Sequence, residues 1–287
     1  MKKIALINDL SGFGKCSLTA AIPVVSVMGI QACPLPTAVL SSQTGFASYF
    51  CDDYTDKMDK FTNEWAKLGV KFNGIHSGYL ASPKQINNVA HFLDTFQTTD
   101  TIYLCDPVMG DSGHKYSMFT QTLLEGMRGL CKRATICTPN LTELCLLANT
   151  NYNLLIVHSH EDKYLDYITD ICKKFLASSM RPISTILVTG IIRDKKERQF
   201  VGNLAVTKNN NCFDVNYLET PYTGLSFSGT GDLLAAVICS SLVNGLSVKD
   251  AVQKSIDFLQ PAIEDATKEN VERNHGVHFE KYLSKLI

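Results

Sequence analysis

The residues best suited to chemistry stand in one short stretch, Gly229-Thr230-Gly231-Asp232, which directly precedes an apolar run. Apolar residues on every face of residues 233–239 predict a helix buried inside an α/β protein. The two glycines would leave backbone N–H groups open at the helix start, where they can hold an anion. Asp232 could take a proton from an attacking hydroxyl there, or it could simply cap the helix. This stretch alone leaves both roles open.

Three further acids follow predicted strands or begin a predicted helix. Asp106 and Asp111 lie five residues apart in a loop, and Glu143 follows Thr138-Pro139-Asn140. Their oxygen atoms suit Mg²⁺, which keeps several waters and takes further ligands from phosphates. Turn formation and a favourable interaction with the helix dipole are the alternative roles. His158 and His160 have no acid or thiol partner in their motif, so we interpret them as surface residues.

The glycine-containing segment after the first predicted strand, residues 8–15, does not fit either common nucleotide-binding motif. A Walker loop needs Gly where Asp9 stands and Ser or Thr where Cys16 stands. A dinucleotide fingerprint would need a third Gly at Ser17. Both motifs are therefore excluded, and Asp9 is expected either to point into a cleft or to belong to a structural turn.

The elements that must position these residues alternate in type along the chain. Short apolar runs predict buried strands at residues 4–7, 36–40, 74–75, 102–105, 135–137 and 185–188. Amphipathic patterns between them predict helices at residues 17–28, 83–96, 119–130 and 163–176. This alternation predicts right-handed β-α-β units, hence a mostly parallel sheet flanked by helices.

Polar residues gather where these strands end, which is where open parallel sheets bind ligands. A cleft along one sheet edge is therefore expected. After Gly190, weak alternation over residues 198–206 and 212–215 predicts an antiparallel hairpin. A last amphipathic segment runs from Val248 to about residue 271, and Pro261 is expected to kink or divide it. No linker or internal repeat interrupts the chain, so residues 1–287 are expected to form one domain.

Composition narrows the class of protein. Hydrophobic residues make up 45% and charged residues 19% of the 287 residues, as in globular proteins. The net charge of −1 argues against partners such as nucleic acid or an acidic membrane. The ten cysteines are irregularly spaced, and Cys105, Cys137 and Cys239 lie in apolar runs. We interpret these as small buried side chains of a cytoplasmic protein in a reducing compartment, without a signal peptide or membrane span.

The chain resembles the ribokinase-like superfamily, and within it the pyridoxal kinases of vitamin B6 salvage. The matching pieces occur in the family's order over nearly the whole chain: Ser41-Ser42-Gln43-Thr44-Gly45, Ser77-Gly78-Tyr79, Cys105-Asp106-Pro107-Val108-Met109-Gly110-Asp111, Thr138-Pro139-Asn140 with Glu143, Val188-Thr189 and Gly229-Thr230-Gly231-Asp232. The resemblance implies a three-layer α/β fold with a short antiparallel hairpin and, for relatives of this size, a homodimer.

Residue roles follow from the same resemblance. It implies that Asp232 is the catalytic base and that the amides of Gly229, Thr230 and Gly231 hold the transferring phosphate. It implies Mg²⁺ at Asp106, Asp111 and Glu143, and ATP phosphates or a monovalent cation, K⁺ or Na⁺, near Asp106, Thr138, Asn140, Glu143 and Thr189. Thr44 and Tyr79 would contact the small-molecule substrate. Asp9 is expected to face the substrate ring for a separate reason, which is that it directly follows the first predicted strand.

Asp9 is the departure from the pyridoxal kinases, which commonly place a serine there. Hydroxymethylpyrimidine kinases of the same superfamily have an Asp-x-Ser-Gly pattern like Asp9-Leu10-Ser11-Gly12. We expect ATP-dependent phosphorylation of the 5′-hydroxymethyl group of pyridoxal, pyridoxamine or pyridoxine. The alternatives are a hydroxymethylpyrimidine kinase and a catalytically dead ligand-binding protein, although a pure binder would have no need of Asp232 as a base.

Overall fold

The two ends of the chain belong to the same compact unit. A computed structural model describes residues 1–287 except 118, 179–183, 196–197 and 211. Its first unit comprises Met1–Leu104 and Leu225–Ile287, and its second unit comprises Cys105–Gly224. The single domain expected over residues 1–287 stays a prediction. Among the described helices, none is both long enough and apolar enough to cross a membrane.

The strands of the first unit follow the order β5-β4-β1-β2-β3. Their bounds are β1 (Lys3–Ser11), β2 (Gln31–Leu40), β3 (Cys51–Asp53), β4 (Gly74–Ser77) and β5 (Ile102–Cys105). β1 is parallel to both β2 and β4, whereas the short β3 is antiparallel to β2. Ile4, Ala5, Leu6 and Ile7 are fully buried, which is typical of a parallel strand covered on both faces.

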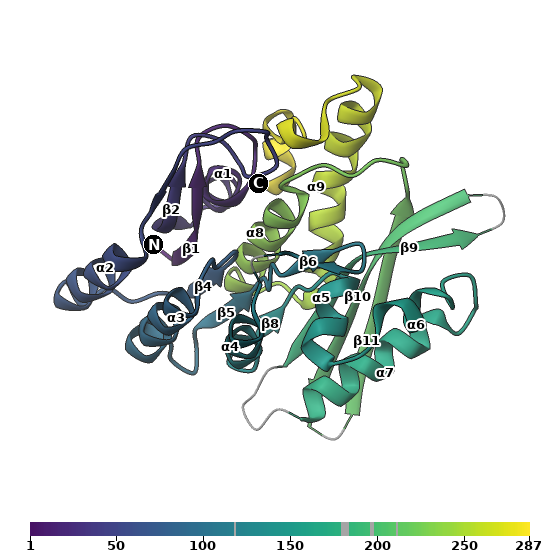
Figure 1. The fold of residues 1–287 in the computed structure, drawn as a ribbon, viewed down its shortest axis with the longest axis horizontal. Helices are drawn as coiled ribbons and strands as arrows, with labels where there is room; N and C mark the ends of the chain where they lie inside the picture. The colour runs from purple at the N-terminus through teal and green to yellow at the C-terminus, as the bar shows by residue number, and fades with distance from the viewer. Residues whose placement is uncertain (118, 179–183, 196–197, 211) are drawn as a thin grey trace. The chain divides into compact units, whose positions relative to one another are not determined.

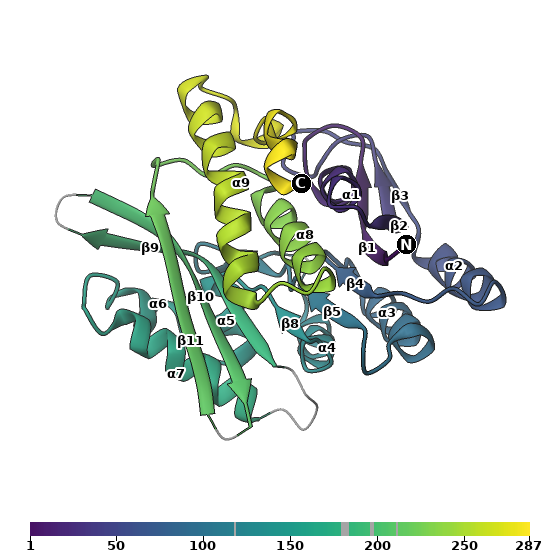
Figure 2. The same ribbon diagram turned by 180° about the vertical axis from the view of Figure 1, so that it is seen from behind.

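Helices cover both faces of these strands (Figures 1 and 2). The connection from β1 to β2 through α1 (Ser17–Val27) and the connection from β4 to β5 through α3 (Pro83–Phe96) run in opposite directions across the sheet. Right-handed crossovers therefore place α1 and α3 on opposite faces. α8 (Thr230–Val243) packs on α1, and α9 (Val248–Lys268) packs on α8. α2 (Thr55–Lys67) packs on α3.

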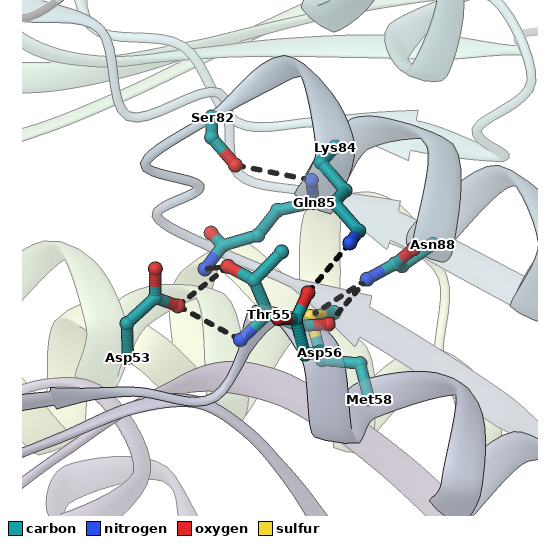
Figure 3. Close-up of polar contacts among 8 residues, drawn as sticks. All are labelled: Asp53, Thr55, Asp56, Met58, Ser82, Lys84, Gln85 and Asn88. Carbon is teal, nitrogen blue, oxygen red and sulfur yellow. Dashed lines mark hydrogen bonds and ion pairs between the residues drawn. The ribbon is translucent and has the colours of Figure 1, made fainter.

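A buried polar cluster joins the starts of α2 and α3 (Figure 3). Gln85 Nε2 donates to the Thr37 carbonyl at 3.1 Å and to Thr55 Oγ1 at 2.9 Å, while Asn88 Nδ2 donates to the Thr55 carbonyl at 2.8 Å. Ser82 caps α3 by accepting a hydrogen bond from the Gln85 amide. Because buried amides are costly when unpaired, these bonds fix α3 against β2 and α2.

The second unit has strands in the order β11-β10-β9-β8. β8 (Ile136–Cys137) is parallel to β9 (Thr185–Lys195), while β10 (Arg198–Asn209) is antiparallel to β9 and to β11 (Cys212–Pro221). β6 (Gly110–Asp111) and β7 (His114–Lys115) form a separate small hairpin. The remaining elements are α4 (Gln121–Cys131), α5 (Leu141–Ala148), α6 (Tyr152–Ile156) and α7 (Tyr164–Ala177). Figures 1 and 2 show α5, α6 and α7 on one face of β9–β11.

The mostly parallel α/β architecture and the antiparallel hairpin are confirmed, with differences in detail. β10 and β11 are longer than the predicted hairpin strands. α2 was not expected, because its sequence is strongly polar. β9 continues past Gly190 to Lys195, because a bulge there absorbs the turn-forming glycine. α9 continues through Pro261 as one helix and is not divided. Two short 3₁₀ helices, η1 (Arg273–His275) and η2 (Phe279–Leu286), follow α9.

Candidate active-site residues

Asp232 lies in the first turn of α8, where the sequence predicts an anion-binding helix start. Its Oδ1 accepts a hydrogen bond from Asn8 Nδ2 at 3.1 Å, and its carboxylate also accepts one from the Ser17 backbone amide. These donors come from the end of β1 and the start of α1. Three elements of the first unit therefore meet at one carboxylate. A residue that only caps its own helix would not need hydrogen bonds from two other elements.

The surroundings of Asp232 raise the pKa of its carboxyl group to about 6. Burial contributes most to this rise and the negative charge of Asp9 adds to it, whereas the hydrogen bonds from Ser17 and Asn8 lower the pKa. A carboxylate with a pKa in this range is largely ionised at neutral pH yet basic enough to accept a proton. These properties suit a general base.

Glycine stands at positions 229 and 231 for different structural reasons. Gly229 has φ +83°, and a Cβ there would lie 1.8 Å from the Lys15 carbonyl oxygen. Only glycine therefore fits at position 229. A Cβ on Gly231 would meet no atom within 4 Å, so the space beside this backbone is open. Open space next to amides at a helix start is what a bound phosphate requires.

Asp9 lies at an irregularity in β1. The parallel register with β2 shifts between Asn8 and Leu10. Both carboxylate oxygens of Asp9 accept hydroxyl hydrogen bonds of 2.7 Å, one from Ser11 and one from Ser17. Asp9 is thus held within β1 by hydroxyl groups from the end of this strand and the start of α1, and only 8% of its surface is exposed. Its expected contact with the substrate stays a prediction.

Ser17 combines two contacts with an uncommon backbone. It donates its hydroxyl to Asp9 and its amide to Asp232. Its φ of +51° lies in the left-handed region that glycine favours. Strain of this kind is characteristic of functional sites, where the surrounding contacts maintain it. Sequence reasoning considered Ser17 only as a mismatch to a glycine motif and so missed it.

Asn8 is the second residue that sequence reasoning missed. Besides its bond to Asp232, its Oδ1 accepts the backbone amides of Asp9 at 3.0 Å and Tyr79 at 3.2 Å. Gly78 leaves room for this side chain, since a Cβ there would lie 2.3 Å from Asn8 Nδ2. The available signal was an asparagine at the end of an otherwise apolar strand, which is unusual in a buried position unless the side chain is hydrogen-bonded.

Tyr79 and Thr44, the other predicted substrate contacts, occupy loops of the first unit. Tyr79 follows β4 and is tied to Asn8 through its backbone. Thr44 is exposed in the loop after β2. Asn274, in the C-terminal segment, holds this loop and the glycine motif together. Its Nδ2 donates to the Gly45 carbonyl at 2.7 Å, and its Oδ1 accepts from Ser228 Oγ at 3.2 Å.

The second unit contains the residues predicted to bind nucleotide and metal. Asp106 follows β5, and Thr138 follows β8. Thr138 Oγ1 donates to Asp106 Oδ1 at 3.1 Å, and the Thr138 amide donates to the Cys105 carbonyl at 3.2 Å. Asp106 and Thr138 are both buried. Asp106 and Thr138 therefore present a carboxylate and a hydroxyl side by side within the second unit.

Glu143 forms a capping box with Asn140 at the start of α5. Its Oε2 accepts from the Asn140 amide at 2.8 Å, and its Oε1 accepts from the Met109 amide at 3.0 Å. Asn140 Nδ2 donates to the Gly110 carbonyl at 2.8 Å. Burial, followed by the charge of Asp106, raises the pKa of Glu143 well above its ordinary value. The capping role and a metal role are compatible, because carboxylate oxygens accept more than one bond.

Asp111 and Thr189 are less buried than Asp106, Thr138 and Glu143. Asp111 is exposed, and its Oδ1 accepts a hydrogen bond of 2.8 Å from the backbone amide of the next residue, Ser112. Thr189 lies on the β9 bulge, where Thr189 and Gly190 oppose the single residue Asn203. The Thr189 amide donates to the Pro139 carbonyl at 2.9 Å. The bulge thus takes Thr189 out of the β9–β10 ladder and directs it toward the Thr138-Pro139-Asn140 segment.

The few carboxylates of the second unit suit Mg²⁺, which takes most of its ligands from water and phosphates, and are too few for a metal held by protein ligands alone. The unit supplies the carboxylates of Asp106 and Glu143, with Asp111 exposed nearby in sequence. Mg²⁺ commonly binds one or two carboxylates and completes its octahedron with waters and phosphate oxygens. A cation would also relieve the repulsion between Asp106 and Glu143 that contributes to the raised pKa of Glu143.

Comparison with known proteins shows the family of the chain. A family model described as phosphomethylpyrimidine kinase matches residues 16–278. A pyridoxal kinase of Leifsonia xyli is 24% identical over 279 residues, which span 93% of this chain and 92% of that protein.

Solved structures extend the comparison. A Bacteroides thetaiotaomicron protein assigned to the phosphomethylpyrimidine kinases and crystallised with pyridoxal is 34% identical, with a TM-score of 0.88 over 99% of this chain and 95% of that chain. A Leishmania donovani pyridoxal kinase in complex with ADP and pyridoxamine is 20% identical, with a TM-score of 0.80 over 100% of this chain and 96% of that chain. The fold is therefore ribokinase-like, as predicted, and the chain belongs to the phosphomethylpyrimidine kinase family.

Proposed function

We propose that this protein phosphorylates the 5′-hydroxymethyl group of a vitamin B6 vitamer with ATP. The observation that carries the proposal is Asp232, a carboxylate with a raised pKa held by Asn8 and Ser17 beside open space at Gly231. A binding protein would gain nothing from a negative charge at an anion site. A kinase needs such a base to take the proton of the attacking hydroxyl.

In the first unit, the backbone provides charge stabilisation and the side chains provide orientation. The amides of Gly229, Thr230 and Gly231 hold the transferring phosphate at the start of α8, where the helix dipole favours negative charge. Asn8 and Ser17 fix the carboxylate of Asp232, which accepts the hydroxyl proton. Thr44, Tyr79 and Asp9 contact the ring of the substrate.

In the second unit, the side chains bind the nucleotide and its metal. Asp106, Asp111 and Glu143 would hold Mg²⁺, directly or through water. When bound, Mg²⁺ neutralises phosphate charge. Thr138, Asn140 and Thr189 position the nucleotide phosphates, and a monovalent cation, K⁺ or Na⁺, shares this region. The hydrogen bond between Thr138 and Asp106 keeps the two groups in fixed relation.

The similar proteins support a B6 vitamer as acceptor and ATP as donor. The Leifsonia xyli relative is named a pyridoxal kinase, and the Bacteroides thetaiotaomicron protein was crystallised with pyridoxal. The Leishmania donovani enzyme was crystallised with ADP and pyridoxamine. The second candidate is a hydroxymethylpyrimidine kinase, which the family description and Asp9-Leu10-Ser11-Gly12 favour.

A coupled ADP-release assay separates these candidates. Purified protein is given MgATP and, in separate reactions, pyridoxal, pyridoxamine, pyridoxine and hydroxymethylpyrimidine. We expect the highest kcat/KM with a B6 vitamer. A higher kcat/KM with hydroxymethylpyrimidine would transfer the assignment to the second candidate, and ADP release that no acceptor stimulates would contradict a small-molecule kinase.

We further propose that the chain works as a single kinase domain in the cytoplasm and as a homodimer. The abundance of cysteine thiols supports a reducing compartment. Light scattering coupled to size exclusion measures the oligomeric state directly, and a monomeric mass at assay concentration would contradict the homodimer.

A further inference from the structure

Three cysteine thiols meet in the interior of the second unit, at the ends of three different elements. Cys105 ends β5, Cys131 ends α4, and Cys137 ends β8. All three residues are 0% exposed, and their sulfur atoms lie within 4.8 Å of one another. The sulfurs of Cys105 and Cys131 are 3.7 Å apart. Sequence reasoning treated Cys105 and Cys137 as separate buried side chains and did not predict this cluster.

The spacing of these sulfurs is close to that of sulfurs bound to one ion. Ligands about 2.3 Å from a zinc-sized ion lie about 3.8 Å apart at the corners of a tetrahedron. The sulfur of Met127 lies 4.0 Å from the Cys105 sulfur, so a thioether adjoins the three thiols. Purely sulfur-based ligand sets select soft, thiophilic ions. Binding such an ion requires small side-chain movements and no rearrangement of the elements.

Ligand number and charge decide which ion fits. Structural Zn²⁺ sites are four-coordinate. Among the residues that the structure describes, the group within ligand distance contains three cysteines and no histidine or carboxylate. Three thiolates on Zn²⁺ would leave a net negative charge in an apolar interior, which is unfavourable. Trivalent arsenic forms three covalent bonds, carries a lone pair in the fourth direction, and gives a neutral product with three thiolates.

We propose that Cys105, Cys131 and Cys137 form a buried three-thiol site that binds trivalent arsenic, delivered as arsenous acid. Three As–O bonds and three S–H bonds break, and three As–S bonds form. The three displaced hydroxyl groups leave as three water molecules with the thiol protons. Arsenic remains trivalent, so the step requires no oxidant or reductant. Because the thiols are fully buried, binding follows local opening of the unit and is slow.

Arsenic binding at this site would shift the nucleotide-binding residues, because the backbone connects them directly to two of the cysteines. Cys105 directly precedes Asp106, and Cys137 directly precedes Thr138. The Asp106–Thr138 hydrogen bond of 3.1 Å joins the same two strand ends. Pulling the two sulfurs onto one atom would disturb this pair. This consequence rests on the proposed function, and it predicts an increase of at least about threefold in KM for ATP with little change in KM for the vitamer.

Binding itself is tested without any activity measurement. Full-length protein in a phosphine reductant is incubated with arsenite, desalted, and examined by intact-mass spectrometry and by ultraviolet As–S absorbance. We expect one retained arsenic per chain and a raised melting temperature. Cys131→Val removes one of the three thiols, and Cys172→Val is the matched control, because Cys172 is equally buried in the same unit but lies outside the cluster. Cys137→Ala removes a second member independently.

The proposal predicts at least a tenfold loss of arsenite affinity in Cys131→Val and Cys137→Ala and wild-type affinity in Cys172→Val. The melting temperature of each variant without arsenite establishes that it is folded. Retained arsenic in either folded cluster variant at wild-type affinity would overturn the site, as would Zn²⁺ held more tightly than arsenite by the wild type. If kinase activity is absent, the mass and absorbance results still decide the site, so the two proposals fail separately.

Discussion

Asn8 Nδ2 donates a hydrogen bond to Asp232 Oδ1 across 3.1 Å, joining two residues that are 224 positions apart in the chain. The same asparagine holds the Tyr79 backbone amide through its Oδ1. One side chain at the end of β1 therefore orients the proposed base on α8 and the start of the loop after β4. We infer that Asn8 is a positioning residue for the reaction.

Asn8→Ala should lower kcat without unfolding the protein. Hydrogen bonds to charged groups are worth about 1.5–3 kcal/mol, so we expect a decrease on the order of 10- to 100-fold. Because this bond lowers the pKa of Asp232, its loss should also move the acidic limb of the kcat/KM profile to higher pH. Asn153→Ala, at an exposed position, is the control. A reduced kcat with an unmoved acidic limb would show that Asn8 acts on something other than Asp232.

Asp9→Ser should move the acidic limb of the kcat/KM profile to lower pH, opposite to the shift expected for Asn8→Ala. The negative charge of Asp9 raises the pKa of Asp232, so removing it lowers that pKa and extends activity to more acidic solutions. If Asp9 also accepts a hydrogen bond from a protonated ring nitrogen or an amine, the substitution should reduce kcat/KM for pyridoxamine and hydroxymethylpyrimidine more than for pyridoxal. Equal losses for all substrates would assign Asp9 to the Ser11–Ser17 turn alone.

Gly229 and Gly231 offer a matched pair of alanine substitutions. Gly229→Ala forces a left-handed backbone and a clash with the Lys15 carbonyl, so we expect a loss of roughly 1–3 kcal/mol in unfolding free energy. Gly231→Ala places its methyl group in open space, so stability should be kept while kcat/KM falls at least about tenfold, because the methyl group occupies the phosphate position. Wild-type kcat/KM in a stable Gly231→Ala protein would contradict the phosphate position.

Activity should require a divalent cation, and Asp106→Ala should raise the Mg²⁺ concentration for half-maximal rate. Asp106 is buried and hydrogen-bonded to Thr138, whereas Asp111 is exposed. Asp111→Ala, its companion, should therefore have the smaller effect. The measurement is initial rate against free Mg²⁺ at saturating ATP. Full wild-type activity in excess chelator would end the assignment of a metal.

Elements whose sequences contain clear capping residues or a clear apolar pattern were predicted with the correct bounds. α3 begins and ends where the sequence predicts, because Pro83 follows a capping serine and apolar residues recur with helical spacing up to Phe96. β5 also matches its predicted bounds, since a short apolar run ends at Asp106-Pro107. α2 was missed although Met58, Phe61 and Trp65 recur with helical spacing, because the other residues of this segment are mostly polar.

The candidate residues were predicted less completely than the fold. Asp232, Asp106 and Glu143 stand in recognisable local patterns, and the structure places each at a strand end or a helix start. The hydrogen-bond partners of Asn8 and Asn274 could not be predicted from local patterns, because these partners are distant in sequence. The irregularities at Asp9 and Thr189 depend on strand register, which no local pattern in either strand reports.

The most direct measurement of the central claim is the turnover of Asp232→Asn with MgATP and the preferred vitamer. General-base removal costs on the order of 10²–10⁴ in rate, so we expect a fall in kcat within that range. The folded-state pKa of Asp232 is raised, so ionisation above its unfolded value of 3.8 opposes folding, and Asn should keep or raise the melting temperature at pH 8. Lost turnover with undiminished stability is the result the assignment predicts. A folded Asp232→Asn protein that keeps more than half of wild-type kcat would show that Asp232 only caps α8 and would contradict the proposed mechanism.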